Sequence, residues 1–155
     1  MSITPGVITS PNHPDDYPDN IDKTEHITVG SKEILRLEFT AFAVWVGGSI
    51  HICPTDFVRI TDGDGTTLMD NSCGYSDPSS PWYFQPPIIT SFTNTVEIYF
   101  HTNEKVATSG WSLVWTALVA GGCLTVTSSH SSSHNLPNEG FLRPSKLSAS
   151  SCCSE

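Results

Sequence analysis

Positive charge is scarce in this sequence. Seven Lys and Arg residues stand against 16 Asp and Glu, and the formal net charge is -9 at pH 7. Phosphate backbones attract basic surfaces, so this balance argues against nucleic acid as a partner. The acidity is explained by solubility, or else by a site for a cation or a basic partner.

Several other signals are missing. No apolar run reaches the 18 residues of a membrane span. The first residues, MSITPGVITSPNHP, have neither the basic nor the apolar region of a signal peptide, so we expect any export signal to lie outside this chain. No CxxC or paired Cys/His zinc spacing occurs, and no nucleophile, metalloprotease or nucleotide motif is present. We therefore predict that the chain is not an enzyme.

What the sequence does contain is short alternating segments separated by turn residues. The 155 residues include 11 Pro and 11 Gly, and no stretch of about 12 residues keeps a helical period. This pattern predicts an all-β protein, an antiparallel β-sandwich of about eight to ten short strands. We expect a first strand that starts at Val7 and Ile8. The further strands are expected within 25–29, 34–42, 52–74 (two strands), 88–93, 94–102 and 110–118.

The alternation also assigns faces to the strands. In segment 34–42 we expect the core face to consist of Leu35, Leu37, Phe39 and Ala41. In the two last strands we expect shared faces made of Val96, Ile98 and Phe100, and of Trp111, Leu113 and Trp115. The cluster at 82–84 is interpreted as a core plug, since large aromatic side chains are usually buried, with an exposed contact as the alternative.

Residues 52–74 are the most informative stretch. Val58 and Ile60 point to one face, and DGDG at 62–65 predicts a tight hairpin, because Gly accepts a positive φ. The two strands would bring Cys53 and Cys73 near one another. A disulfide there would close a loop of about 20 residues and contribute roughly 3 kcal/mol in an oxidising compartment.

Six segments, in order, resemble a CUB domain. They are SPNHPDDYP at 10–18, LRLEFTAF at 35–42, CPTDFVRITDGDG at 53–65, CG at 73–74, NTVEIYFHTN at 94–103 and SGWSLVWTA at 109–117. The resemblance implies a jelly-roll-like sandwich in a secreted protein or in the extracellular part of a cell-surface protein. It also implies that Cys53 and Cys73 form the second of the two disulfides usual in the family. The first is missing, since Glu25 stands where one of its cysteines would lie.

Many CUB domains bind calcium, and the resemblance indicates which positions matter here. Tyr17 and Asp56 match the family's calcium site, but Trp45 replaces a Glu and Asn103 replaces an Asp. Calcium prefers hard, charged oxygen ligands. We therefore expect no metal and no cofactor, with calcium as the alternative.

The composition changes after residue 118. We predict a CUB-like domain over 1–118 and a Ser-rich linker or tail over 119–155. The alternative is that this tail is the truncated start of a second CUB repeat, with Cys123 and Cys152 as a second disulfide pair. His130 and His134 are four residues apart, but their Ser-rich flanks favour a solvated tail over a metal site.

The resemblance implies a non-catalytic extracellular binding module that recognises a protein or a glycan through loops at the ends of the sandwich. The candidate contact residues are Trp45, Trp82, Tyr83 and Glu104. The alternative is an accessory domain of a secreted metalloprotease or serine protease whose catalytic domain is not in this chain.

Overall fold

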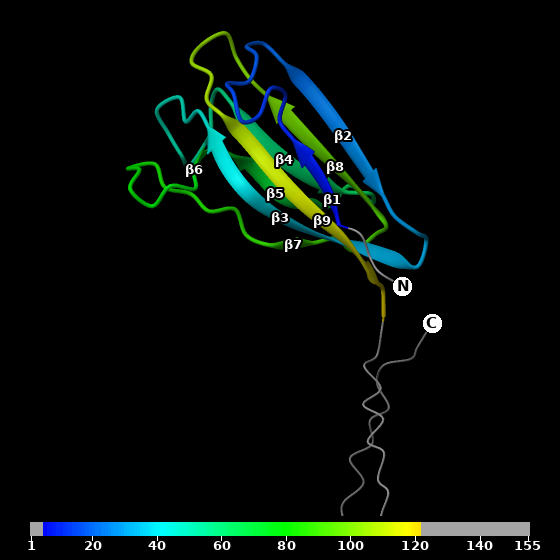
Figure 1. The fold of residues 1–155 in the computed structure, drawn as a ribbon. Coiled ribbons are helices and arrows are strands. Elements are labelled where there is room, and N and C mark those ends of the chain that lie inside the picture. The colour runs from blue at the N-terminus through cyan, green and yellow to red at the C-terminus, as the bar shows by residue number, and fades with distance from the viewer. Residues whose placement is uncertain (1–4, 122–155) are drawn as a thin grey trace, which may run out of the picture. The chain divides into compact units, whose positions relative to one another are not determined.

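The computed structural model describes residues 5–121, and this part of the chain folds into two facing antiparallel sheets without a helix (Figure 1). Its nine strands agree with the predicted antiparallel β-sandwich. They are β1 (Gly6–Thr9), β2 (Asp22–Thr28), β3 (Glu33–Val44), β4 (Phe57–Asp62), β5 (Thr67–Ser72), β6 (Gly74–Tyr75), β7 (Ile89–Thr90), β8 (Thr95–His101) and β9 (Gly110–Val119).

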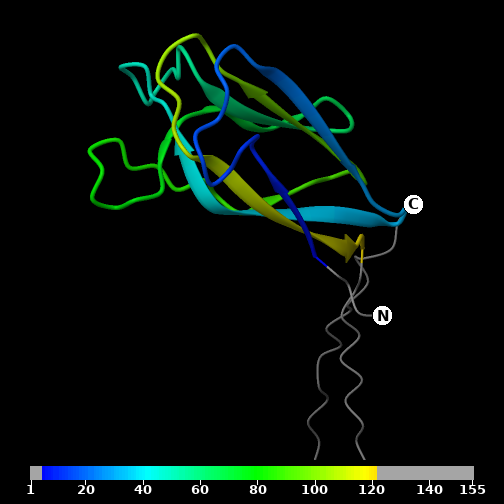
Figure 2. The same ribbon diagram turned by 45° about the horizontal axis from the view of Figure 1, so that its top comes forward.

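The two sheets contain strands that are distant in the sequence. One has the order β1-β9-β3-β6, with β7 also paired to β3, and the other has the order β2-β8-β4-β5. Figure 2 shows the two layers edge-on, with β3 and β9 in one and β2 and β8 in the other. The segments that follow β1, β3 and β8 meet at one end of the sandwich, and the β2–β3 turn lies at the other.

The core lies between the inner faces of the sheets, and most of the predicted faces are confirmed. The predicted residues that are buried there are Leu35, Leu37, Phe39, Val58, Ile60, Val96, Ile98, Phe100, Trp111 and Leu113. Trp115 is partly buried and packs against this cluster. Rings pack edge-to-face through the layer, for example Phe39 on Trp111 at 6.0 Å between centroids.

The predicted core face of β3 is wrong at Ala41, because the strand contains a β-bulge. The register with β9 pairs Phe39 with Leu113 and then Ala41 with Ser112, so Thr40 is an extra residue. The bulge reverses the alternation, and the buried side chains beyond it are those of Phe42 and Val44. Ala41 is only half-buried.

The predicted strand at 88–93 is much shorter in the structure, where β7 has two residues. After Thr90, hydrogen bonds to polar side chains replace the backbone pairing of the strand. The Asp62 carboxylate accepts hydrogen bonds from the backbone N–H of Phe92 (2.6 Å) and Thr93 (3.1 Å), and from the Thr93 hydroxyl. Ser91 is also buried and accepts the N–H of Leu35 at 2.7 Å. A fixed loop therefore replaces most of the predicted strand.

The hairpin and its disulfide are confirmed. Strands β4 and β5 pair around the turn that begins at Asp62, and Cys53 and Cys73 are disulfide-bonded with their Cα atoms 5.6 Å apart. Both cysteines are buried. Glu25, near which a cysteine of the family's first disulfide was expected, forms an ion pair with Lys23 at 2.6 Å.

Candidate functional site

The candidate site is built around a buried hydrogen bond between Tyr17 and Asp56. The Tyr17 hydroxyl donates to Asp56 Oδ2 at 2.6 Å and accepts the backbone N–H of Trp45 at 3.0 Å. The side chains of Tyr17 and Asp56 come from the segment after β1 and the residue before β4, and both residues are at most 2% exposed. Phe100 packs edge-on against the Tyr17 ring at 5.1 Å between centroids. The structure thus brings together two of the predicted positions.

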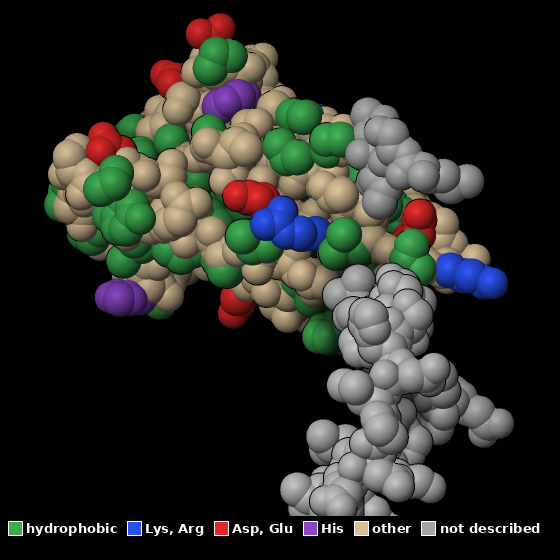
Figure 3. Space-filling model, turned by 60° about the horizontal axis from the view of Figure 1, so that its bottom comes forward, with side chains coloured by type: hydrophobic (Ala, Val, Ile, Leu, Met, Phe, Trp, Pro, Cys, Tyr) green, Lys and Arg blue, Asp and Glu red, His purple; other side chains and the backbone are tan. Residues whose placement is uncertain are grey.

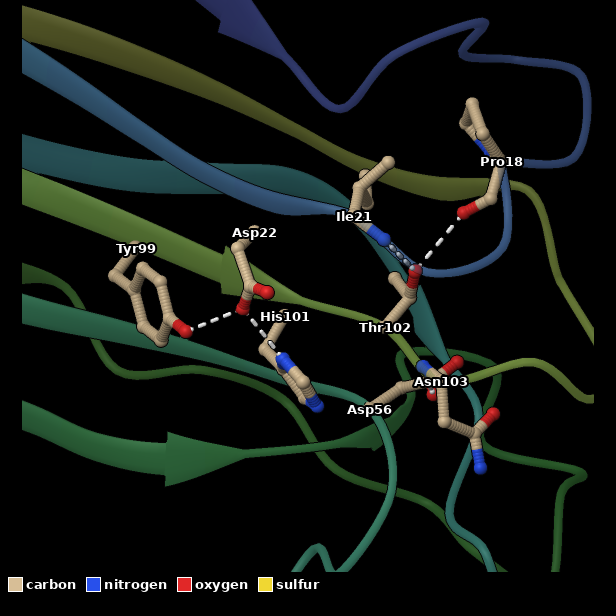
Figure 4. Close-up of polar contacts among 8 residues, drawn as sticks. All are labelled: Pro18, Ile21, Asp22, Asp56, Tyr99, His101, Thr102 and Asn103. Atoms are coloured by element: carbon tan, nitrogen blue, oxygen red, sulfur yellow. Dashed lines mark hydrogen bonds and ion pairs between the residues drawn. The ribbon is translucent and has the colours of Figure 1, made fainter.

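Asn103 joins this pair through its backbone. Its N–H donates to Asp56 Oδ1 at 3.0 Å, while its side-chain oxygen accepts the N–H of Lys105 at 2.9 Å. In Figure 4 the Asn103 amide extends away from the Asp56 carboxylate. Both carboxylate oxygens of Asp56 are therefore bonded to donors of the protein itself.

Burial dominates the electrostatics of the pair. Loss of hydration raises the pKa of the Asp56 carboxyl above its usual value, although the hydrogen bonds from Tyr17 and Asn103 and the nearby His101 oppose the shift. The pKa of the Tyr17 hydroxyl is raised as well, first by burial and then by its hydrogen bond to Asp56. The hydroxyl therefore remains a proton donor at neutral pH.

These residues do not fit a calcium ion. Calcium takes six to eight oxygen ligands, several of them charged. Here Asp56 is the only acidic side chain of the matched positions, Trp45 directs a backbone N–H into the site, and Asn103 directs another. Within residues 5–121 no group of three or more His, Cys, Asp or Glu is arranged for a metal.

A second polar cluster, which the sequence did not predict, lies on the outer face of the four-stranded sheet (Figure 4). The Asp22 carboxylate accepts the Tyr99 hydroxyl at 2.5 Å and lies 2.7 Å from His101 Nδ1. The hydrogen bond from Tyr99 is the main reason that the pKa of Asp22 is lowered. Beside them, Arg59 lies over the Tyr99 ring, 5.1 Å from its centroid. Predicting this cluster would have required the register of β2 with β8, which the alternation of side chains does not determine.

The aromatic pair Trp82 and Tyr83 is exposed, so the predicted core plug is wrong for these two residues. They are 40% and 48% exposed, whereas Phe84 is half-buried and packs on Phe42 at 5.7 Å between centroids. The other large exposed hydrophobic residues are not adjacent to one another in the sequence, and Figure 3 shows hydrophobic side chains scattered among polar ones on one face. Isolated apolar residues are normal on a protein surface, whereas contiguous exposed apolar surface can mark an interaction site.

The remaining candidates are less distinctive. The Trp45 side chain is half-buried, and Glu104 is exposed on the β8–β9 loop, without an ion pair among the residues that the structure describes. Cys123 and Cys152 lie outside the described residues, as do His130 and His134. The domain boundary at residue 118 and the alternatives for the tail stay predictions.

A family model described as CUB domain matches residues 1–115, nearly three quarters of the chain. The chain belongs to the CUB domain family. Its curated relatives include rat cubilin, 31% identical over 143 residues, and the zinc metalloproteinase nas-39 of Caenorhabditis elegans, 32% identical over 125 residues. These matches cover 89% and 79% of this chain but only 4% and 12% of the relatives, so the chain spans a small fraction of their length.

The solved structures confirm the CUB fold. The MASP-1 CUB2 domain bound to Ca2+ superposes with a TM-score of 0.61 over 72% of this chain and 90% of that one, at 23% identity. At this identity the likeness shows the jelly-roll sandwich alone, and the calcium ion is a property of that structure. Among residues 5–121 there is also no helix of the length and apolarity that a membrane crossing requires.

Proposed function

We propose that this CUB domain is a non-catalytic binding module of an extracellular protein. It would bind a partner protein through the loop between β6 and β7, at Trp82 and Tyr83. The observation that carries the proposal is the exposure of these two adjacent large aromatic residues. Trp and Tyr are enriched at the energetic centres of protein interfaces, since they bury much area while ordering few torsions.

The loop that presents them is held in one shape. The Trp82 carbonyl accepts the N–H of Tyr75 at 3.1 Å, and the Tyr75 carbonyl accepts the N–H of Phe84 at 2.8 Å. Phe84 then anchors the loop on Phe42 in the core. A loop that is ordered before binding loses little conformational entropy when a partner docks. This ordered, exposed arrangement of Trp82 and Tyr83 supports a role for the loop in partner recognition.

We further propose that binding needs no calcium. In the candidate site, the hydroxyl of Tyr17 and the N–H of Asn103 each donate a hydrogen bond to one carboxylate oxygen of Asp56. These donors stabilise the carboxylate without an ion, and no second carboxylate among the matched positions supplies further charge.

An extracellular location fits the disulfide between Cys53 and Cys73, since such bonds persist in oxidising compartments. The likeness to nas-39 favours a second candidate function, an accessory domain of a secreted protease. The sequence beyond this chain distinguishes the two, because a catalytic region with a zinc-binding HExxH motif would favour the protease.

The test is binding to an array of extracellular proteins, with a glycan array alongside. The full chain should bind at least one protein, the double variant Trp82→Ser/Tyr83→Ser should lose that binding, and EDTA should not change it. The matched control is Phe92→Ser, which removes another exposed aromatic residue, 74% exposed. No protein bound by the wild-type chain, equal loss in the two variants, or binding to glycans alone would contradict the proposal. Loss of binding in EDTA would contradict its calcium-independence.

A further inference from the structure

Strand β2 is an open edge of the four-stranded sheet. It pairs with β8 over seven consecutive residue pairs, from Asp22–His101 to Thr28–Thr95, without a register shift. The other edges are less regular, since β1 has four residues, β6 has two, and β5 contains two register shifts. Within the described part of the chain, β2 therefore offers the longest regular edge, and Figure 1 shows it at the side of the sandwich.

The backbone groups that point to the open side can be identified. The carbonyl of Ile21 accepts the N–H of Thr102 at 2.9 Å, and the N–H of Val29 donates to the carbonyl of Asn94 at 2.9 Å. Both flanking residues thus bond toward β8. Because antiparallel bonding alternates along a strand, odd-numbered residues between them face β8 as well. The residues whose N–H and C=O face the open edge are Asp22, Thr24, His26 and Thr28.

The charges of β2 are complementary to β2 itself in one register. If two copies pair antiparallel about a two-fold axis at Thr24, the oppositely charged side chains of Lys23 and the partner's Glu25 face one another. Asp22 then lies opposite the partner's His26, whose imidazole can donate a hydrogen bond to a carboxylate. Opposite charges in directly facing pairs stabilise a sheet, and like charges destabilise it. Moving the axis by one residue, to Lys23 or Glu25, would place that residue opposite its own copy.

We propose that β2 pairs with β2 of a second copy of this chain, antiparallel and centred on Thr24. The pairing joins two four-stranded sheets into one continuous sheet. About six backbone hydrogen bonds would form, two in each of the three pairs that face the edge. Charged residues on an edge strand usually prevent pairing, but here they would select one register.

The side chains that the pairing uses are accessible. The exposed fractions are 64% for Asp22, 62% for His26, 45% for Lys23 and 33% for Glu25. The edge is also separate from the β6–β7 loop, so this self-association does not depend on the proposed binding function.

Sedimentation of the full chain up to about 0.5 mM should show a monomer–dimer equilibrium. Lys23→Glu and Glu25→Lys should each weaken the dimer by tenfold or more, because each places like charges opposite one another. An equal mixture of the two variants should form a heterodimer, since the charges again match. The double variant Lys23→Glu/Glu25→Lys should dimerise like the wild type.

Thr24→Pro separates pairing from folding. Its N–H faces the open edge, so proline there removes no bond to β8, and proline is tolerated on edge strands. It should keep the cooperative unfolding of the wild type and abolish the dimer. The proposal is wrong if the wild-type chain stays monomeric over this range, if either charge variant dimerises unchanged, or if the mixture forms no heterodimer.

Discussion

Replacing Tyr17 with Phe tests whether the hydroxyl of Tyr17 stabilises the buried carboxylate in place of a metal. The substitution removes one oxygen and keeps the ring that packs on Phe100. Asp56 loses a hydrogen bond of 2.6 Å, and the N–H of Trp45 loses its acceptor. A hydrogen bond to a charged group contributes about 1.5–3 kcal/mol, and an unsatisfied N–H costs about 1–3 kcal/mol. Trp45 is half-buried and can be hydrated, so we expect a total loss of about 3 kcal/mol.

Urea unfolding followed by Trp fluorescence measures this loss as a change in the free energy of unfolding. The matched control is Tyr83→Phe, which removes a hydroxyl from an exposed ring and should change stability by less than about 0.5 kcal/mol. A double-mutant cycle of Tyr17→Phe with Asp56→Asn should show coupling of more than about 1 kcal/mol. A loss below about 1 kcal/mol, or restoration of stability by added calcium, would refute the reasoning.

Three other predictions concern stability. Cys53→Ala/Cys73→Ala should lower the free energy of unfolding in urea by about 3 kcal/mol, because the bond closes a loop with a sequence separation of 20; no change would show that the crosslink restricts the unfolded chain little. Folding raises the pKa of Asp56, so the stability from this group is present at low pH and declines as pH rises through the folded pKa. Asp56→Asn should therefore destabilise less at pH 7 than at pH 4, relative to the wild type, and the opposite order of urea midpoints would contradict the assigned shift. Asp62→Ala should cost roughly 3 kcal/mol in urea and speed hydrogen exchange at Phe92, since it removes charged hydrogen bonds to the loop; unchanged exchange would mean that the loop is held by other contacts.

Alternation was sufficient to predict the sandwich and most of its core. Side chains in a strand alternate between the two faces of the sheet, whatever the strand pairs with. The apolar residues at every second position, such as Val58 and Ile60 on β4, could therefore be assigned to the buried face from the sequence. The bulge at Thr40 was not predictable in this way, because it is defined only by the register of β3 against β9.

The residues of the candidate site were predicted, but the hydrogen bonds that they form were not. The resemblance pointed to Tyr17, Asp56 and Asn103, and the structure brings them together. That Asn103 would act through its N–H depends on the backbone conformation after β8, which residue type does not determine. The link between Asp22 and His101 joins residues 79 positions apart and required the pairing of β2 with β8.

The exposure of Trp82 and Tyr83 differs from the statistical preference of large aromatic residues for the core, which was the basis of the prediction. Large aromatic residues are usually buried, but the backbone bonds between Tyr75 and the neighbouring residues 82 and 84 fix the loop at the surface. Only Phe84 then reaches the core.

The bulge in β3 also determines where this strand can lose a residue. Deleting Thr40 would leave Phe39 opposite Leu113 and Phe42 opposite Trp111, so the ladder with β9 would become regular. Phe42 and Val44 would keep pointing into the core. Exchanging Thr40 for another exposed residue leaves both halves in place. In a scan of single-residue deletions along residues 33–44, Thr40 should therefore be the best-tolerated position, because a deletion at a regular pair turns neighbouring side chains to the opposite face.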